Sequence, residues 1–404
     1  MTGPAPREGV RVSTSASALA FVESPVQLLN VLEWAHARAA AAGRPLDGVP
    51  SQRGRRAAGP GAPPARAPAH TPPRVPVRSA ARPPPHPWPP AHPPRWAELA
   101  RDEGCEVQWQ EARGSRLAPL KALAALARDV RAARTVVVGD PFSRYVQLLL
   151  TLVRAEELVV VDDGTATMEF VAQTARGERL VRWHRVGGGT LPGRVRELAY
   201  APVSSAARRR FAPDRGAGAG KARRVEVFTS MPVVPHGGMT LRTNEFAWTR
   251  ARFGPPRLTK GTDLVGTSLV ETGIVDPDRY LDAVRSLTLE HGATRYFAHR
   301  RESPEKLRAL SRETGLEIVR PDLPLELIAR RGPVGRTILS FPSTVVHTLP
   351  YALTGTGVTV AVCDVDPAWL TGSASPRARS FLAGVTDTAR DVHRLPAQVA
   401  PTAG

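Results

Sequence analysis

Two adjacent acidic residues, Asp162 and Asp163, follow an apolar run and precede Gly164. The run predicts a buried strand, so both carboxylates would lie at its carboxyl end, where the glycine permits a sharp turn into a helix. Adjacent carboxylates can raise each other's pKa, which helps one of them accept a proton from an attacking hydroxyl group. The alternative is an acidic pair that only caps the following helix.

A second polar segment, His299, Arg300 and Arg301, lies at the end of the predicted strand TRYFAH and precedes the predicted helix start Ser303-Pro304. Cations beside a helix N-terminus suit a phosphate or a carboxylate, and a histidine there can protonate or hydrogen-bond a departing oxygen. The alternative is a solvated turn in which the arginines pair with the glutamates that follow.

Hydroxyl groups gather where the predicted strand RTILSF runs into another helix, at Ser340, Ser343 and Thr344. Together with the free amides of the helix N-terminus they would form a second anion cradle. Simple N-capping by Ser343 is the alternative, and it is compatible with ligand binding. His347, one turn further along, is predicted to belong to the helix surface or to the core.

Signals for other kinds of site are weak. The stretch GAGAGK at 216–221 lacks the spacing and the following Ser or Thr of a P-loop, and no Gly-x-Gly-x-x-Gly follows a strand. No Cys/His cluster has metal-ligand spacing, and the acidic pair is contiguous rather than Asp-x-Asp. We therefore predict a site with no metal and no bound cofactor.

Strands and helices alternate along most of the chain, which predicts parallel sheets. A length of 404 residues suits two lobes, each with its own core. We expect a disordered N-terminus over 1–16, a first lobe over 17–203, a basic linker over 204–224 and a second lobe over 225–395. The fold prediction is an α/β protein with two Rossmann-like, doubly wound lobes facing a cleft, into which strand ends present the polar segments.

The segment 49–95 interrupts the first lobe where its β-α order requires a second strand. It holds 16 of the 40 prolines and almost no large aliphatic residue, so we expect no core strand or helix in it. A disordered basic insert and an out-of-frame stretch produced by compensating frameshifts are both compatible with this composition. Neither gives the segment a catalytic role.

The formal net charge of +18 would suit a nucleic-acid-binding protein. Most of the excess lies in 49–95 and 204–224, where few aromatic residues accompany the cations, whereas nucleic-acid readers concentrate both on an ordered face. We therefore expect no nucleic-acid partner. A gel shift at physiological salt that persists after deletion of 49–95 would contradict this expectation.

The two cysteines, Cys105 and Cys363, lie far apart and fit a reducing compartment. The first residues do not show the pattern of a signal peptide, which is a charged start followed by a long apolar run. The apolar runs of the sequence are shorter than a membrane span. The expected location is cytoplasmic, with any membrane contact being peripheral at the inner face.

Together, these segments resemble the motifs of the bacterial sialyltransferase and polysialyltransferase-like families, which are glycosyltransferases with two Rossmann-like lobes of the glycosyltransferase-B (GT-B) type. The matching segments are ESPVQLLN at Glu23–Asn30, the Asp-Asp-Gly at Asp162–Gly164, LVGTSLVETG at Leu264–Gly273, HRRE at His299–Glu302 and the pair Ser343-Thr344. Ala298 stands where proline is usual, and Thr267-Ser268 replaces a common Gln-Pro.

The resemblance implies a general base at Asp163, a histidine at His299 that assists the phosphate of CMP, and phosphate binding by Ser343 and Thr344. The remaining residues of the implied substrate-binding set are Asp162, Gly164, Glu271, Arg300, Arg301 and Ser340. The implied reaction is the inverting, metal-independent transfer of sialic acid, or a related nine-carbon acid sugar, from a CMP-activated donor to a glycan hydroxyl in cell-surface glycan biosynthesis. A UDP-sugar glycosyltransferase or epimerase on the same fold is the alternative.

Overall fold

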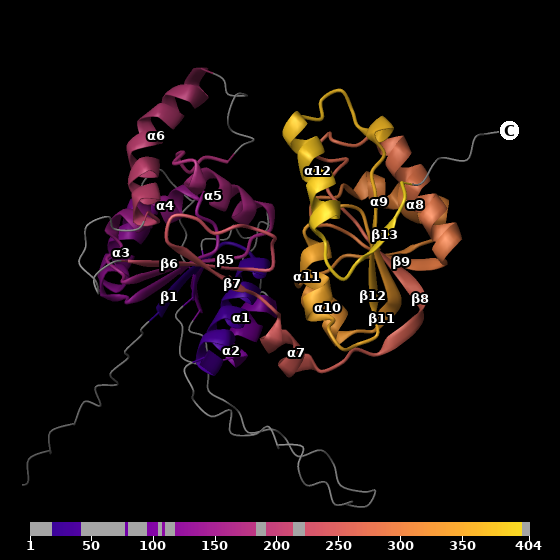
Figure 1. The fold of residues 1–404 in the computed structure, drawn as a ribbon, viewed down its shortest axis with the longest axis horizontal. Coiled ribbons are helices and arrows are strands. Elements are labelled where there is room, and N and C mark those ends of the chain that lie inside the picture. The colour runs from indigo at the N-terminus through magenta and orange to yellow at the C-terminus, as the bar shows by residue number, and fades with distance from the viewer. Residues whose placement is uncertain are drawn as a thin grey trace, which may run out of the picture.

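The computed structural model describes residues 18–41, 77–79, 95–103, 107–109, 118–182, 191–212 and 223–397. Within these ranges the chain forms two α/β lobes side by side, each built around one sheet (Figure 1). All strand pairings in both sheets are parallel. The predicted fold, an α/β protein of two lobes built on doubly wound parallel sheets, is therefore confirmed.

The first sheet has seven strands in the order β3-β2-β1-β4-β5-β6-β7. These strands are β1 (Ala18–Val22), β2 (Val77–Ser79), β3 (Val107–Trp109), β4 (Thr135–Val138), β5 (Glu157–Val161), β6 (Arg224–Thr229) and β7 (Met239–Thr243). The helices of this lobe are α1 (Pro25–Ala41), α2 (Arg95–Asp102), α3 (Ala118–Ala132), α4 (Arg144–Leu152), α5 (Thr165–Ala175) and α6 (Leu191–Arg210), and α7 (Ala247–Phe253) follows β7.

The second sheet has six strands in the order β10-β9-β8-β11-β12-β13. These strands are β8 (Leu258–Val265), β9 (Ala293–Phe297), β10 (Glu317–Val319), β11 (Val334–Ser340), β12 (Thr359–Cys363) and β13 (His393–Leu395). Its helices are α8 (Pro277–His291), α9 (Pro304–Thr314), α10 (Leu325–Arg331), α11 (Val345–Ala352) and α12 (Pro376–Thr388), with a short 3-10 helix at Pro367–Trp369.

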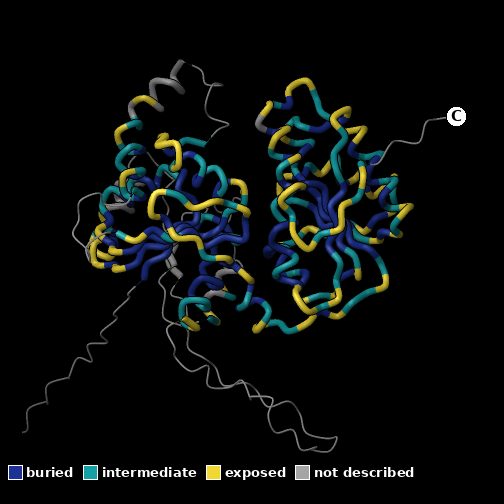
Figure 2. Tube along the Cα trace, viewed as in Figure 1, coloured by how far each residue is buried: buried dark blue, intermediate teal, exposed yellow. Residues whose placement is uncertain are grey.

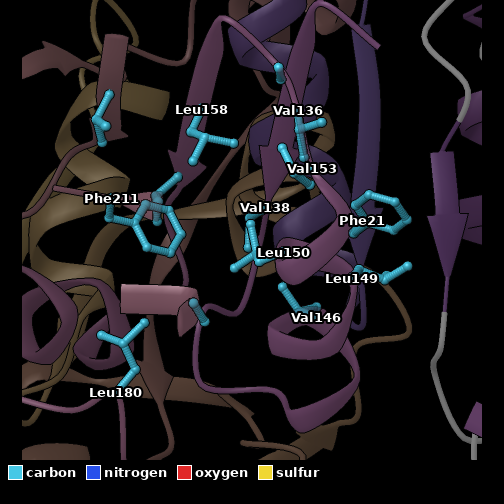
Figure 3. Packing of buried hydrophobic residues seen from close by; sticks show 14 of the residues in the cluster. Phe21, Val136, Val138, Val146, Leu149, Leu150, Val153, Leu158, Leu180 and Phe211 are labelled. Carbon is cyan, nitrogen blue, oxygen red and sulfur yellow. The ribbon is translucent and has the colours of Figure 1, made fainter. Parts of the chain in front are cut away.

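The cores follow from continuous apolar strands that helices cover on both faces. Alternate residues of β1, β4, β5 and β6 point into two different clusters, one packed against α3 to α6 and the other against α1 and α7. Figure 3 shows the first cluster, in which Phe21, Val138 and Leu158 from the strands meet Leu149 and other helix residues. In both lobes the central strands are buried and the exposed residues lie at the periphery (Figure 2).

The two lobes meet through α7, α10 and α11. Leu323, Leu327 and Ala352 of the second lobe belong to the same apolar cluster as α1 and the strands of the first lobe. Glu33 of α1 also accepts hydrogen bonds from the backbone N–H groups of Trp248 and Thr249, each at 2.9 Å, at the start of α7. Because α7 directly precedes the second lobe, these hydrogen bonds hold the segment that connects the two lobes against α1 of the first lobe.

The sheet order corrects the predicted boundary between the lobes. Segment 225–230 was expected to open the second lobe, but β6 pairs with β5 and β7 pairs with β6, so the first sheet extends to Thr243. The expected linker over 204–224 begins inside α6 and ends at β6, and its residues 213–222 lie outside the described ranges. A local pattern predicts a strand, but it does not predict which sheet that strand joins.

A second correction concerns the proline-rich segment. Val77–Ser79 forms β2, which pairs with β1 on one side and β3 on the other, so the expectation that 49–95 holds no core strand is wrong at these three residues. They form a stretch without proline or glycine, which leaves their N–H groups available for the parallel ladder. Arg95 begins α2, and the rest of the segment, like the predicted disorder over 1–16 and Cys105, lies outside the described residues.

Helix starts that the sequence predicted are confirmed. Asp276 accepts hydrogen bonds from Asp278 N–H and Arg279 N–H at the start of α8, and Ser303 accepts one from Lys306 N–H at the start of α9. Both helices have proline in the first turn and end at a glycine. The start of α9 fixes the loop that carries His299.

Candidate active site

The predicted site residues come together because they follow strands at the carboxyl edges of the two sheets. In the first sheet the chain order reverses between β1 and β4, and in the second between β8 and β11. Ligands of open α/β sheets bind at such switch points. The Asp162–Gly164 turn follows β5, next to the first switch point, and Ser343 and Thr344 follow β11 at the second.

Asp162 is directed into the first lobe. It is 2% exposed, and its carboxylate accepts hydrogen bonds from Gly164 N–H at 2.8 Å and Ser230 N–H at 3.2 Å. Its backbone oxygen accepts one from the Asn30 side chain at 2.9 Å. Burial raises the pKa of Asp162, and these hydrogen bonds oppose the rise. The contacts hold the turn in place, and a direct contact of Asp162 with substrate stays a prediction.

Asp163, next to Asp162 in the turn, is a partly buried carboxyl group with a raised pKa. Burial and the nearby charge of Asp140 raise its pKa to about 7, while Arg182, a hydrogen bond from Gln27 and the charge of Arg300 oppose the rise. The Arg182 guanidinium lies 2.8 Å from an Asp140 carboxylate oxygen and 3.7 Å from one of Asp163. A carboxylate with a pKa near neutral pH can accept a proton and remain ionised often enough to act.

A small hollow adjoins Arg182 on the first lobe. Its lining includes Phe142, Arg144, Arg179 and Tyr200 besides Arg182, and no acidic residue. The guanidinium of Arg182 lies 5.8 Å from the centre of the Phe142 ring, and that of Arg144 lies 5.2 Å from the Tyr200 ring. The hollow therefore combines cations with aromatic faces next to Asp163.

Gly164 brings the first lobe against the second. Its φ of 65° and ψ of −123° are accessible to glycine and strained for other residues. A Cβ atom at this position would lie 3.0 Å from Cγ2 and 3.2 Å from Oγ1 of Thr344. The turn that carries Asp163 thus touches the residue that precedes α11.

The hydroxyl groups of Ser340 and Ser343 lie together at the start of α11, and anion binding by this segment stays a prediction. Ser340 is buried and its hydroxyl donates to Phe341 O at 2.8 Å, with the Ser343 hydroxyl 3.1 Å away. Neither Ser343 nor Thr344 caps the helix through its side chain, since Thr344 is the N-cap residue and makes no such bond. The alternative of simple side-chain capping by Ser343 is therefore wrong. The N–H groups of Val346 and His347 donate instead to the backbone oxygens of Ser343 and Thr344, at 3.3 and 3.1 Å.

His299 is a neutral hydrogen-bonding group in the second lobe. Burial, together with the nearby charges of Arg300 and Arg301, lowers its pKa to about 4, and the charge of Glu271 opposes the shift. Its Nδ1 accepts a hydrogen bond from the N–H of Arg301 at 3.2 Å. Since Nδ1 acts as an acceptor, the proton of the neutral ring is on Nε2, which can donate to a ligand oxygen.

A buried polar network supports the His299 loop. Glu302 accepts hydrogen bonds from His299 N–H at 2.6 Å and from the Tyr296 hydroxyl at 2.6 Å, and Lys306 Nζ lies 2.8 Å from its carboxylate. Glu271 accepts from Ser303 N–H at 3.3 Å and lies 3.6 Å from Lys306 Nζ. Glu271 thus lies under the loop, and its predicted substrate contact stays a prediction.

Arg300 and Arg301 are exposed. In the described part of the chain they form no ion pair with the neighbouring glutamates, because Glu302 is bonded to Lys306 and Glu305 pairs with Arg308 at 2.9 Å. The alternative of a self-paired turn is therefore wrong. The positive charge of Arg300, in the second lobe, lowers the pKa of Asp163 in the first lobe. The His299 loop and the Asp163 turn are therefore close enough to interact electrostatically.

Sequence reasoning missed Glu326. This carboxyl group on α10 is buried, accepts a hydrogen bond from the Thr348 hydroxyl at 2.6 Å and interacts with the charge of Asp162 in the other lobe. Burial raises its pKa, Thr348 opposes the rise and Asp162 adds to it. No local signal marks Glu326, because it follows a proline in an ordinary amphipathic helix start.

No group of three or more His, Cys, Asp or Glu side chains in the described ranges could hold a metal ion. None of the described helices has the length and apolar character needed to cross a membrane.

No protein-family model and no curated protein sequence matches this chain. Solved structures similar to it include an alpha/beta-galactoside alpha-2,3-sialyltransferase from the luminous marine bacterium Photobacterium phosphoreum, with 8% sequence identity, a TM-score of 0.46 and coverage of 93% of this chain and 98% of that one. The GT-B domain of a sialyltransferase from Photobacterium damselae has 10% identity, a TM-score of 0.41 and coverage of 94% and 100%. MurG from Acinetobacter baumannii has 10% identity, a TM-score of 0.37 and coverage of 94% and 85%.

Proposed function

We propose that this protein is an inverting glycosyltransferase that moves sialic acid, or a related nine-carbon acid sugar, from a CMP-activated donor to a glycan hydroxyl. One observation carries the proposal. Asp163, a partly buried carboxyl group on the first lobe with a pKa of about 7, adjoins Gly164, which closely approaches Thr344 at the start of α11, and the second lobe carries cationic and hydroxyl groups around that helix start and on the His299 loop. A base and an anion site on opposite lobes suit a group transfer between them.

In this proposal Asp163 activates the acceptor. Its carboxylate accepts the proton of the acceptor hydroxyl as the oxygen attacks the anomeric carbon of the donor sugar. Arg182 lies 2.8 Å from a carboxylate oxygen of Asp140 and 3.7 Å from one of Asp163, so it holds the proposed base on the first lobe. The acceptor therefore approaches from the first lobe.

The second lobe holds the leaving group. The bond between the anomeric carbon and the phosphate oxygen breaks, and its electron pair stays on the phosphate of CMP. Ser343, Thr344 and the positive end of the α11 dipole bind that phosphate, and His299 donates from Nε2 to an oxygen that gains charge. Attack from the first lobe with departure toward the second gives inversion at the anomeric carbon.

The proposed independence of metal rests on the same groups. Arg300 and Arg301 are exposed beside His299, and the α11 N-terminus adds a positive dipole end. Together they supply the positive charge that a phosphate leaving group needs. The CMP specificity rests on the sequence motifs around Asp163, His299 and Ser343.

A donor screen tests the proposal. Calorimetry on the full chain should show binding of CMP and no binding of UDP, and incubation with CMP-sialic acid and a glycan panel should release CMP and form a glycoside in the presence of EDTA. UDP binding without CMP binding would instead establish the alternative, a UDP-sugar glycosyltransferase or epimerase. Loss of transfer in EDTA, restored by a divalent cation, would overturn the metal-independent mechanism.

A further inference from the structure

His347 is a buried side chain with an unused hydrogen-bonding atom. It is 5% exposed, and its Nε2 atom is fully buried without a hydrogen-bond partner. Burying a polar atom without a partner is unfavourable, so native proteins do it rarely and often at functional sites. The sequence predicted this residue to be part of the helix surface or of the core, and neither role explains the unpartnered nitrogen.

The position of His347 on α11 places it beside the proposed anion site. It follows Thr344 by three residues and Ser343 by four, which is the spacing of neighbours on one helix face. Helical side chains tilt toward the helix N-terminus, so the imidazole is directed over the turn that begins with these two hydroxyl residues.

The neighbouring residues of α11 show which side of the helix this is. Val345 and Leu349 pack into the core of the second sheet. Thr348 bonds to Glu326, which interacts with the first lobe, and Ala352 belongs to the apolar cluster shared between the lobes. At about 100° per residue, His347 lies on the side of Thr344 and away from Leu349, between Thr348 and Val346, which packs against Val362 and Val385.

We propose that His347 is a further donor-binding residue, whose imidazole donates a hydrogen bond to the phosphate of the nucleotide held by Ser343 and Thr344. This inference rests on the function proposed above and adds a ligand contact to the same site. The bound phosphate supplies the acceptor that the buried ring lacks in the free protein.

The ionisation state of His347 fits this role. Burial lowers its pKa to about 4, so the ring is neutral at physiological pH and carries one N–H donor. A neutral donor binds a phosphate oxygen without requiring a permanent buried charge in the free protein. His299 has the same property on the facing loop, so two neutral imidazoles would approach the phosphate from two elements.

The test compares His347→Leu and His347→Gln with wild type in the full-length protein. Calorimetry measures the affinity of each for CMP and for cytidine, which lacks the phosphate, and thermal unfolding without ligand measures stability. His393→Leu, at an exposed histidine on β13, is the matched control.

His347→Leu should weaken CMP binding about tenfold to a hundredfold, the usual effect of one hydrogen bond to a charged group, while cytidine affinity stays within about twofold. The unfolding temperature of this variant should equal or exceed that of wild type, because the substitution removes an unsatisfied polar atom. His347→Gln, which keeps an N–H donor, should recover part of the CMP affinity, and the control should match wild type.

Two results overturn the inference while leaving the proposed function intact. One is wild-type CMP affinity in His347→Leu, and the other is an equal loss of CMP and cytidine affinity accompanied by a lower unfolding temperature, which identifies a structural residue. Failure of the wild-type protein to bind CMP would instead refute the proposed function itself.

Discussion

At the scale of single residues, the surroundings of Asp163 set its proton affinity through opposing effects. Burial and Asp140 favour the protonated acid, whereas Arg182 and Gln27 favour the carboxylate. The result, a pKa of about 7, is balanced for proton transfer at neutral pH. Asp162, its neighbour in sequence, is committed to hydrogen bonds within the first lobe.

Asp163→Asn should therefore separate binding from turnover. The amide keeps the size of the side chain but cannot accept the acceptor proton, so we expect near-normal CMP affinity and a loss of about 10²-fold to 10⁴-fold in turnover. Steady-state kinetics and calorimetry measure the two quantities. Full activity in this variant would contradict a general-base role for Asp163 and would favour the alternative, in which the acidic pair only caps the following helix.

The pH profile provides an independent check of the same residue. Because Asp163 must be ionised to act, kcat/KM should rise with pH through about 7. Asp140→Asn removes a negative charge that raises this pKa, so the rising limb should move to lower pH. Asp282→Asn, on the outer helix α8, should leave the limb in place, and a limb that is unmoved by Asp140→Asn would identify another ionising group.

At the scale of secondary-structure elements, the site depends on how closely two loops approach. Gly164 combines a backbone strained for other residues with contact to Thr344, whereas Gly177 has a similar φ of 68° and nothing within 4 Å. The two glycines therefore allow backbone strain to be separated from the contact between the lobes.

Gly164→Ala and Gly177→Ala should each lower the free energy of unfolding by about 1–3 kcal/mol through backbone strain. Only Gly164→Ala should also reduce turnover and CMP affinity, because its new methyl group displaces Thr344 at the start of α11. Chemical denaturation and kinetics distinguish the two effects. Equal kinetic losses in both variants would contradict a specific role for the contact.

The His299 loop should depend on Glu302 in the same way. Glu302→Gln removes the nearer of the two carboxylates beside Lys306, whose other partner Glu271 lies at 3.6 Å, and weakens the bond to His299 N–H, so we expect a stability loss of about 1–3 kcal/mol together with weaker CMP binding. Glu305→Gln, on the exposed side of α9, should change neither quantity measurably. CMP affinity that is unchanged in a folded Glu302→Gln protein would show that the network does not position His299.

At the scale of the whole molecule, buried carboxyl groups connect and line the lobes. Burial raises the pKa values of three carboxyl groups: Glu33 of α1, which bonds to the start of α7, Glu326 at the interface and Glu302 under the His299 loop. A raised pKa in the folded state contributes stability that is fully present below the unfolded pKa and is lost as pH rises through the folded pKa. The protein should therefore be more stable at mildly acidic pH, although Asp163 needs higher pH to act.

For Glu33, the pH range over which this stability is lost can be stated. Its pKa rises from 4.5 to about 6, so its contribution should be lost between about pH 4.5 and pH 6, by about 2 kcal/mol. Glu33→Gln should flatten that part of the stability curve, measured by denaturant unfolding at each pH. An unchanged slope in the variant would assign the pH dependence to the other buried carboxyl groups.

The sequence by itself determined the α/β class and the polar strand ends. Runs such as TVVV and ELVVV lie in strands covered on both faces, so their apolar character is local and continuous. The starts of α8 and α9 could likewise be read from Asp-Pro and Ser-Pro, because caps depend on adjacent residues. His299 and Asp163 were identified as candidates because each follows such a strand.

The tertiary structure alone decided which strands share a sheet and which polar residues are buried. β6 and β7 belong to the first sheet, and Val77–Ser79 fills a place between two strands, because pairing partners distant in sequence determine both. The burial of Glu326 and of the Nε2 atom of His347 also depends on packing between elements. A local pattern records the shape of one element, whereas burial and pKa depend on whatever the fold brings next to it.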